Sequence, residues 1–459
     1  MSRKSVCVVG AGWAGLAAAV GAVQAGHRVT LVEATRSLGG RARALAHSPA
    51  ALMPDPSFAP LDNGQHILIG GYQETLKLLR LVGVEPQDAL LRVPLCLQFA
   101  DTEGLVLPDW PQPWNLLAGV LRAGGWSLSD KWSLISALRQ WRKAGFQCTA
   151  SATVAELSVG LNSTVVDTLI TPLCFSALNT PPQQASGQVF LTVLHDALVA
   201  RPADANPAWP ALASSDLLLP RVDLSSLFPK AAAHWLEMRG ANLRTACRAQ
   251  APQWNAGRWR VANGDFDAVI WATGAQHAVQ AFGNYAPQAP KNLSIYLQRW
   301  LRVAQSLKYQ AIATVYAHAP GLTLPQPLLA LRSSPLAPAQ CVFDRGQLGG
   351  PKGLLAFVVS ACTGTCDMLQ DQVLAQGNRE LADYLQGQPL TPVQTIVEKR
   401  ATFSCTAGLR RAPQRVAPGL LACGDYLYAP YPATLEGAVR SGMMAALALS
   451  EADGFSWKS

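Results

Sequence analysis

The sequence has little charge: Asp, Glu, Lys and Arg make up 14% of its 459 residues, whereas 49% are hydrophobic. This composition is unusual for a chain whose whole surface meets water, and it supplies enough apolar material for a large core. Some apolar surface is therefore expected to face lipid or a lipid-like substrate. The length predicts two or three domains.

Long apolar runs and clustered cysteines are also missing. No hydrophobic stretch is long and uninterrupted enough to predict a membrane-spanning helix. The ten cysteines form no Cys-x-x-Cys pair and no zinc-like arrangement, which predicts no metal site and a reduced intracellular compartment. The net charge of +8 suits nucleic acid or an anionic membrane, and the absence of a Lys/Arg run or RNA-binding motif favours the membrane. We expect a cytoplasmic protein, peripheral to the inner face of the membrane, with no nucleic-acid partner.

The N-terminal residues predict a dinucleotide site. An apolar strand at 6–9 leads into Gly10, Gly12 and Gly15, which form G-x-G-x-x-G, and an Ala-rich helix continues to Gln24. Glycines at these positions allow a tight turn, backbone approach to a pyrophosphate and close packing of helix on strand. The N-terminus of the helix favours the phosphates.

An acidic residue and a basic turn follow. A second strand at 28–32 ends at Glu33, which is placed to accept hydrogen bonds from both ribose hydroxyls. Gly40 and Arg41 come next, followed by Arg43, and an arginine fork suits phosphate oxygens. With these motifs the sequence resembles the flavin amine oxidase and carotenoid desaturase superfamily. The resemblance implies FAD rather than NAD as the cofactor.

Two later segments extend this resemblance. Residues 61–72 read LDNGQHILIGGY, where the superfamily often returns to the flavin, so Gln65 and His66 are expected near the isoalloxazine or the substrate. Near the C-terminus, a strand ends in Gly-Asp and a helix of small residues starts after a short loop, which in the superfamily contact the ribityl chain and the flavin pyrimidine. The cofactor contacts that the resemblance adds to those above are Trp13, Ala14, Gly64, Gly424, Asp425, Thr434 and Leu435.

Residues 108–143 combine tryptophans with basic residues. This pattern suits the headgroup region of a bilayer, and the alternative is a helical pair that buries its tryptophans beneath a basic face. The tryptophans are Trp110, Trp114, Trp126, Trp132 and Trp141. Residues 170–186 leave two interpretations open, an apolar pocket with a few polar groups or a helix end capped at Asn179.

The order of the segments predicts an α/β fold, with a discontinuous Rossmann-like FAD-binding domain and a mixed α+β substrate domain. We expect the FAD-binding domain to comprise 1–75, 206–284 and 403–459. The substrate domain, which would also face the membrane, comprises 76–205 and 285–402.

Three signatures resemble the hydroxysqualene dehydroxylase family in particular: LDNGQHILIGGY, PLCFSALNTP and YPATLEGAVRSG. The resemblance implies reductive dehydroxylation of hydroxysqualene to squalene in hopanoid and squalene biosynthesis, with hydride passing from reduced flavin to a carbocation formed on loss of water. A proton donor is then needed near the hydroxyl, and the catalytic candidates are His66, Asp62 and Tyr431. The electron donor that reduces FAD stays unidentified.

Two rival functions remain open. One is an oxidative enzyme of the same fold, a carotenoid desaturase or an amine oxidase, for which Tyr426, Tyr428 and Tyr431 would supply aromatic side chains at the flavin face. The other is a membrane-bound flavoprotein that carries or presents lipid without catalysis.

Overall fold

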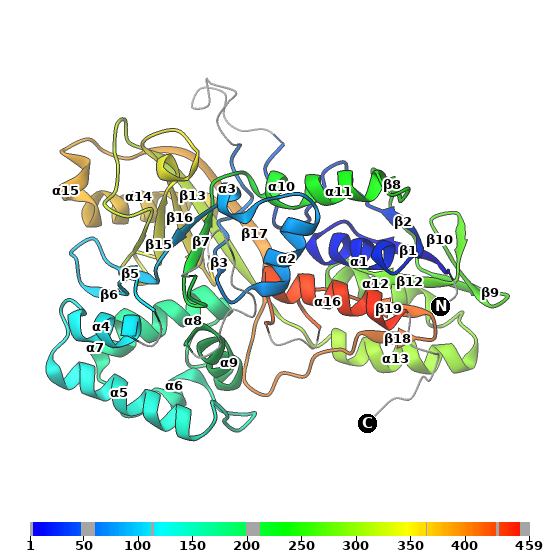
Figure 1. Ribbon diagram of the computed structural model, residues 1–459, viewed down its shortest axis with the longest axis horizontal. Helices are drawn as coiled ribbons and strands as arrows, with labels where there is room; N and C mark the ends of the chain where they lie inside the picture. Colours follow the sequence, from blue (N-terminus) through cyan, green and yellow to red (C-terminus); the bar gives the residue numbers. More distant parts are fainter. Residues whose placement is uncertain are drawn as a thin grey trace.

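The computed structural model describes residues 3–46, 60–111, 114–198, 212–363, 365–427 and 431–449. These residues form two parts that lie side by side (Figure 1). The first part contains a six-stranded sheet with helices packed on it, and the second contains a five-stranded sheet and a helical layer. The predicted α/β fold with a discontinuous Rossmann-like domain is confirmed.

The six-stranded sheet has the order β18-β19-β12-β1-β2-β8. Four of its five strand pairings are parallel, and the fifth, between β18 and β19, is antiparallel. The apolar residues of β1 are buried on both faces, as is usual for a parallel strand covered by helices. The strands are β1 (Ser5–Val9), β2 (Arg28–Val32), β8 (Asn242–Arg244), β12 (Ala268–Trp271), β18 (Arg415–Ala417) and β19 (Leu420–Ala422).

Helix α1 (Trp13–Gln24) packs on this sheet, and α16 (Leu435–Ala448) packs closely against α1. A Cβ added at Gly442 would lie 2.2 Å from the backbone oxygen of Ala14, so only glycine permits this approach. A Cβ at Gly437 would lie 1.8 Å from a backbone oxygen in the preceding turn. The small residues at these two positions therefore serve backbone packing, whereas the sequence suggested that they approach the flavin ring.

The second sheet has the order β14-β15-β16-β13-β17, with every neighbouring pair antiparallel. Helix α14 (Cys366–Glu380) packs against β13 and β17. The strands are β13 (Tyr309–His318), β14 (Leu328–Ala330), β15 (Cys341–Asp344), β16 (Leu354–Ser360) and β17 (Thr391–Phe403). The long strand β17 was not expected from the sequence.

A helical layer lies beside this sheet (Figure 1). Its elements are α4 (Trp114–Arg122), α5 (Leu128–Lys143), α6 (Val154–Leu157), α7 (Ser163–Val165), the π-helical turn η1 (Val166–Ile170), α8 (Thr171–Leu178) and α9 (Gly187–Leu198). Three small sheets complete the fold. One contains β3 (Leu68–Ile69), β7 (Leu217–Pro220) and β4 (Leu90–Val93), and a second contains β5 (Cys96–Gln98) and β6 (Gly104–Val106). The third contains β9 (Gln253–Asn255), β10 (Arg258–Val261) and β11 (Gly264–Phe266). The other helices are α2 (Gln73–Leu81), α3 (Pro86–Ala89), α10 (Leu224–Leu227), α11 (Pro229–Glu237), α12 (Ala275–Tyr285), α13 (Lys291–Ala304), η2 (Arg345–Leu348) and α15 (Ala382–Leu385).

Helix α13 belongs spatially with the nucleotide-binding part. It packs against α12 and β18, and the indole N–H of its buried Trp300 donates to the carbonyl oxygen of Pro413 at 2.9 Å. The sequence placed the start of the second substrate segment at residue 285, ahead of this helix. The apolar face of α13 is buried against the first sheet, so the chain passes from the first part to the second between α13 and β13.

Candidate functional site

A cavity of about 1190 Å³ runs between the two parts. The glycine turn after β1 and the start of α16 line one end of it, and apolar side chains of α5, η1, α8 and α9 line the other. Pockets for a single small molecule usually measure roughly 300–1,000 Å³. The volume therefore suits a dinucleotide together with part of a second, apolar ligand.

The glycine end has the features of a pyrophosphate site. Gly10 and Gly12 line the cavity, and α1 begins after Gly12 with no side-chain cap and no acidic residue in its first turn. The first backbone N–H groups of the helix are thus oriented to bind an anion. Gly40 lies opposite, where an added Cβ would be 3.2 Å from the Cα of Gly12. Gly15 does not line the cavity; a Cβ there would lie 1.9 Å from the oxygen of Gly10, so this glycine holds helix against strand.

Glu33 lies at the carboxyl end of β2 and lines the same cavity. Its carboxylate accepts hydrogen bonds from the backbone N–H groups of Ala11 at 2.8 Å and Thr35 at 2.9 Å, which hold it beside the glycine turn. Trp13 and Ala14, at the start of α1, also line the cavity. The strand end, the acid and the helix start have the arrangement that a dinucleotide ribose and pyrophosphate require.

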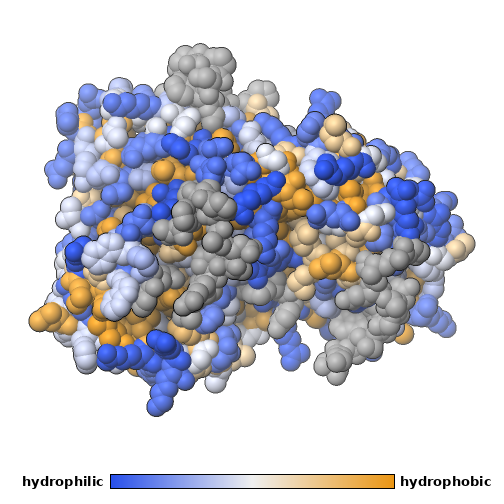
Figure 2. Space-filling view, viewed as in Figure 1, coloured by the Kyte–Doolittle hydropathy of each residue, from blue (hydrophilic) through white to orange (hydrophobic). Residues whose placement is uncertain are grey.

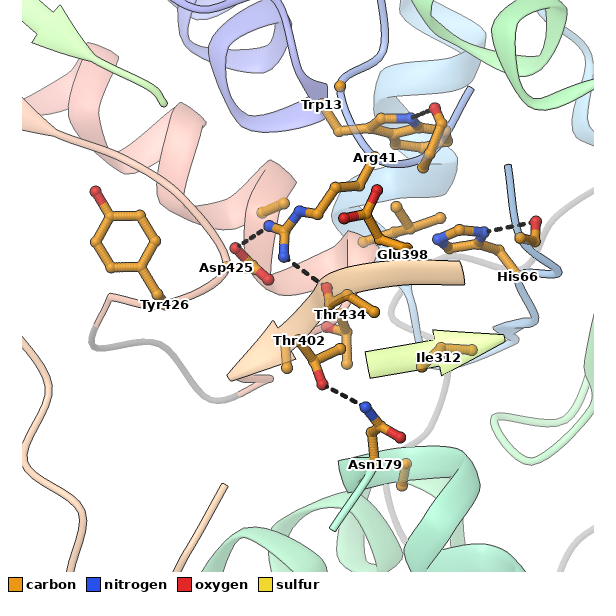
Figure 3. A pocket seen from close by; sticks show the side chains of 18 of the residues that line it. Trp13, Arg41, His66, Asn179, Ile312, Glu398, Thr402, Asp425, Tyr426 and Thr434 are labelled. Carbon is orange, nitrogen blue, oxygen red and sulfur yellow. Dashed lines mark hydrogen bonds and ion pairs between the residues drawn. The ribbon is translucent and has the colours of Figure 1, made fainter. Parts of the chain in front are cut away.

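Arg41 and Asp425 meet in the cavity although they are far apart in the chain (Figure 3). Their side chains form an ion pair with 2.6 Å between Nη2 and Oδ1, and Arg41 also donates to the carbonyl oxygen of Ala401 at 2.6 Å. The nearby Asp425 carboxylate raises the pKa of Arg41. Gly424 lines the cavity next to Asp425. The pair joins the segment expected to hold the pyrophosphate to the segment expected to hold the ribityl chain.

The start of α16 completes this end of the cavity. The hydroxyl of Thr434 accepts from the N–H of Gly437 at 3.0 Å and caps the helix, and both Thr434 and Leu435 line the cavity. Gly64 lines it from the loop before β3. The positive end of the helix dipole favours negative charge on a bound ring system. These backbone cradles, donors and acceptors fit an FAD molecule.

Of the three expected catalytic residues, only His66 lines the cavity. Its Nδ1 lies 3.3 Å from the carbonyl oxygen of Gly64. Burial is the main cause that lowers the pKa of the imidazole to about 4; the contact with the carbonyl oxygen of Gly64 opposes this shift, and the positive charge of Arg41 adds to it. The ring is therefore neutral at pH 7, so His66 does not supply a proton as an imidazolium.

The other two candidates do not line the cavity. The carboxylate of Asp62 accepts from the backbone N–H of Leu224 at 2.9 Å and lies 3.9 Å from Arg345, and burial raises its pKa to about 7. The hydroxyl of Tyr431 donates to the carboxylate of Asp196. Both side chains face hydrogen-bond partners outside the cavity, so neither is placed to reach a ligand in it.

Strand β17 contributes four cavity residues that the sequence did not indicate: Glu398, Arg400, Ala401 and Thr402. Thr402 accepts a hydrogen bond at 2.8 Å from the side-chain amide of Asn179 (Figure 3). Asn179 ends α8 in the left-handed conformation, with φ of 45°, and also lines the cavity. The two interpretations left open for residues 170–186 therefore both hold. Because β17 was not expected from the sequence, no motif indicated that these side chains line a cavity.

The far arm of the cavity is almost entirely apolar. The π-helical turn η1 directs two of its side chains into this arm, and α5, α8 and α9 supply the rest. The residues are Leu134, Leu138, Trp141, Leu169, Ile170, Leu173, Phe175, Phe190, Val193 and Leu194. Such a lining binds a long hydrocarbon and keeps water away from it.

The predicted interfacial tryptophans separate into two groups. Trp126 and Trp141 are only 6% and 5% exposed; the former donates to the hydroxyl of Thr168 at 3.0 Å and the latter lines the cavity, so the interfacial expectation is corrected for both. The other three stay exposed. With neighbouring leucines they form what we call the α4–α5 apolar surface: Trp110, Trp114, Leu117, Leu121, Leu128 and Trp132.

Basic residues border the α4–α5 apolar surface. The guanidinium of Arg122 lies 5.2 Å from the ring centroid of Trp110, and that of Arg139 lies 5.3 Å from the ring of Trp132. Figure 2 shows hydrophobic side chains gathered at the lower left, over the region that α4 and α5 occupy in Figure 1. No helix in the described ranges combines the length and apolar character needed to cross a bilayer.

Residues 13–450 match the model of a family described as flavin containing amine oxidoreductase. A hydroxysqualene dehydroxylase of Sinorhizobium fredii is 27% identical over 98% of this chain and 99% of its own length. One of Rhodopseudomonas palustris is 27% identical over 96% of this chain and 97% of its own. Among solved structures, an oxidoreductase from Methanosarcina mazei superposes with a TM-score of 0.68 at 16% identity, covering 97% of this chain and 100% of that one.

Proposed function

Because the chain belongs to the flavin-containing amine oxidoreductase family and is an FAD-dependent oxidoreductase, we propose that it reduces hydroxysqualene to squalene with loss of water, in squalene and hopanoid biosynthesis. The observation that carries the proposal is a single cavity that joins the FAD motifs to a long apolar arm. A C30 alcohol needs this combination, because its hydroxyl-bearing carbon must reach the flavin while its chains stay out of water.

The residues of this chain have separable tasks in that reaction. The glycine cradle, Glu33, Arg41 and Asp425 bind and orient the cofactor, and the apolar arm orients the substrate. When bound, reduced FAD supplies the hydride that replaces the hydroxyl. Leu169 and Ile170 exclude water, which would otherwise capture the positive charge that develops on carbon.

We further propose that the α4–α5 apolar surface rests on an anionic membrane. Exposed tryptophans beside arginines suit the headgroup region. The inner faces of the same helices line the apolar arm through Leu116, Leu134 and Leu138. A lipid substrate drawn from the bilayer would therefore reach the cavity along α4 and α5.

The direct test is anaerobic. The flavin of the purified protein is reduced, hydroxysqualene is added, and squalene is measured by mass spectrometry while flavin reoxidation is followed by absorbance. We expect squalene in a 1:1 ratio with reoxidised flavin, and no squalene from a matched sample whose flavin is left oxidised. Reoxidation without squalene, or an unchanged substrate, would rule out the proposed reaction.

The same protein tests the oxidative alternatives. Oxygen consumption with an amine, or desaturation of a carotenoid, would indicate an amine oxidase or a desaturase. For an aromatic cage, Tyr426 is fully buried and lines the cavity, whereas Tyr431 does not line it and Tyr428 lies outside the described residues. This arrangement does not favour the amine oxidase alternative.

A further inference from the structure

One face of the five-stranded sheet forms a wall of the cavity. Ile312 on β13 pairs with Ser360 on β16 and with Glu398 on β17, and all three side chains line the cavity. Cross-strand partners share a face of the sheet, so these residues form one row. The next strand continues the wall with Cys341, which pairs with Val358. Glu398 is thus an acidic group at the edge of a largely apolar surface.

Glu398 also touches the flavin motifs. The side-chain amide of Asn63 donates to the carbonyl oxygen of Arg41 at 3.0 Å and to Oε2 of Glu398 at 3.3 Å. Oε1 accepts from the backbone N–H of Arg400 at 3.4 Å. In Figure 3 the side chain rises from β17 toward Arg41. The carboxyl group therefore lies where the cofactor-binding loops meet the wall of the substrate arm.

Within the described residues, three acidic side chains line the cavity: Glu33, Asp425 and Glu398. Glu33 is held by backbone N–H groups at the glycine turn, and Asp425 is paired with Arg41. Glu398 accepts two long hydrogen bonds, from Asn63 and from the backbone of Arg400, and interacts with the charge of Arg41 only beyond ion-pair distance. Among the cavity acids it is the one placed to exchange a proton with a ligand.

We infer that Glu398 is the proton donor of the dehydroxylation, an assignment that rests on the proposed function. Protonated Glu398 transfers its proton to the substrate hydroxyl, and the C–O bond breaks with its electron pair going to oxygen, so that water leaves. The Glu398 carboxylate then faces the positive charge on carbon. The hydride that reduced FAD would supply when bound completes squalene, and a solvent proton restores the Glu398 carboxylic acid.

The assignment is tested with Glu398→Gln, which keeps the size and the acceptor for Asn63 but cannot donate an acidic proton. We expect flavin content and the Kd for hydroxysqualene to be unchanged, and anaerobic squalene formation to fall by about 10²–10⁴-fold. Glu398→Asp should recover part of the rate. Asp371→Asn, which removes an exposed carboxylate on α14, is the matched control and should keep the full rate.

A binding measurement needs no turnover. A squalene analogue with a tertiary ammonium group in place of the cationic carbon should bind the wild-type protein at least about tenfold more tightly than the uncharged hydrocarbon, because a carboxylate faces the charge. Glu398→Gln should abolish that preference. An equal affinity for both analogues in the wild type, or full turnover by Glu398→Gln, would overturn the assignment. If the wild type itself forms no squalene, the proposed function fails instead.

Discussion

Replacing Trp114 and Trp132 with serine is expected to release the protein from anionic vesicles. The two side chains are 63% and 62% exposed and lie on neighbouring helices that also line the apolar arm. A tryptophan buries roughly 150–250 Å² when fully covered, so about 120 Å² of each is free to enter the interface. At about 25 cal/mol per Å² each ring could contribute up to ~3 kcal/mol.

The headgroup region is only partly apolar, so we take about half of that value, ~1.5 kcal/mol for each ring. The double substitution should then cost about 3 kcal/mol, which weakens the partition coefficient by about 100-fold. The measurement is sedimentation with vesicles of anionic phospholipid over a range of lipid concentrations.

The matched control is the double variant Met238→Ser and Leu336→Ser. These side chains are 71% and 79% exposed but lie outside α4 and α5, so their loss should leave vesicle binding unchanged. Flavin content should stay the same in both double variants, because none of the four residues lines the cavity. Equal sedimentation of the tryptophan variant and the wild type would refute the membrane assignment of this surface.

Four further substitutions test the site and the packing around it. Glu33→Ala and Asp425→Ala should each lower the flavin-to-protein absorbance ratio after purification, because each removes a carboxylate expected to bind a hydroxyl-bearing part of FAD; a full flavin complement would contradict the assigned contacts. Gly15→Ala places a methyl group 1.9 Å from the oxygen of Gly10, so the free energy of unfolding should fall by about 1–3 kcal/mol. An unchanged thermal midpoint would show instead that the turn adapts to the methyl group. Burial lowers the pKa of His66 from 6.5 to about 4. Between these two pH values the imidazole is protonated in the unfolded chain but neutral in the folded protein, so the free energy of unfolding falls as the pH drops from about 6.5 to 4. His66→Phe should remove about 2 kcal/mol of the loss between pH 7 and pH 5, as measured by urea unfolding at both values, and an identical loss in variant and wild type would exclude this contribution.

Much of the nucleotide-binding part was predictable because its conformation is local. The apolar strand, the glycine turn, the Ala-rich helix and the second strand end within one or two residues of their predicted limits, from Ser5 to Val32. Gly10 has a φ of 103° and approaches the backbone of Ala272. Both features require glycine, so a glycine in the sequence predicts them. The helix near the C-terminus begins at Leu435, directly after its capping residue Thr434.

The catalytic candidates were less predictable because nearness to a motif in the chain does not decide where a side chain points. Asp62 lies two residues from Gly64, which lines the cavity, yet its carboxylate faces Leu224. Glu398 lies far from every recognised motif and enters the cavity only because β17 pairs with β13.

The tryptophans show the same division. By itself the sequence showed that residues 108–143 are rich in tryptophan and basic residues, and it predicted a glycine turn typical of dinucleotide sites and an α/β fold. Only the tertiary structure decided that Trp126 and Trp141 are buried while Trp114 and Trp132 are exposed. Helix formation and backbone turns depend on neighbours along the chain, whereas burial depends on which distant elements pack against each face.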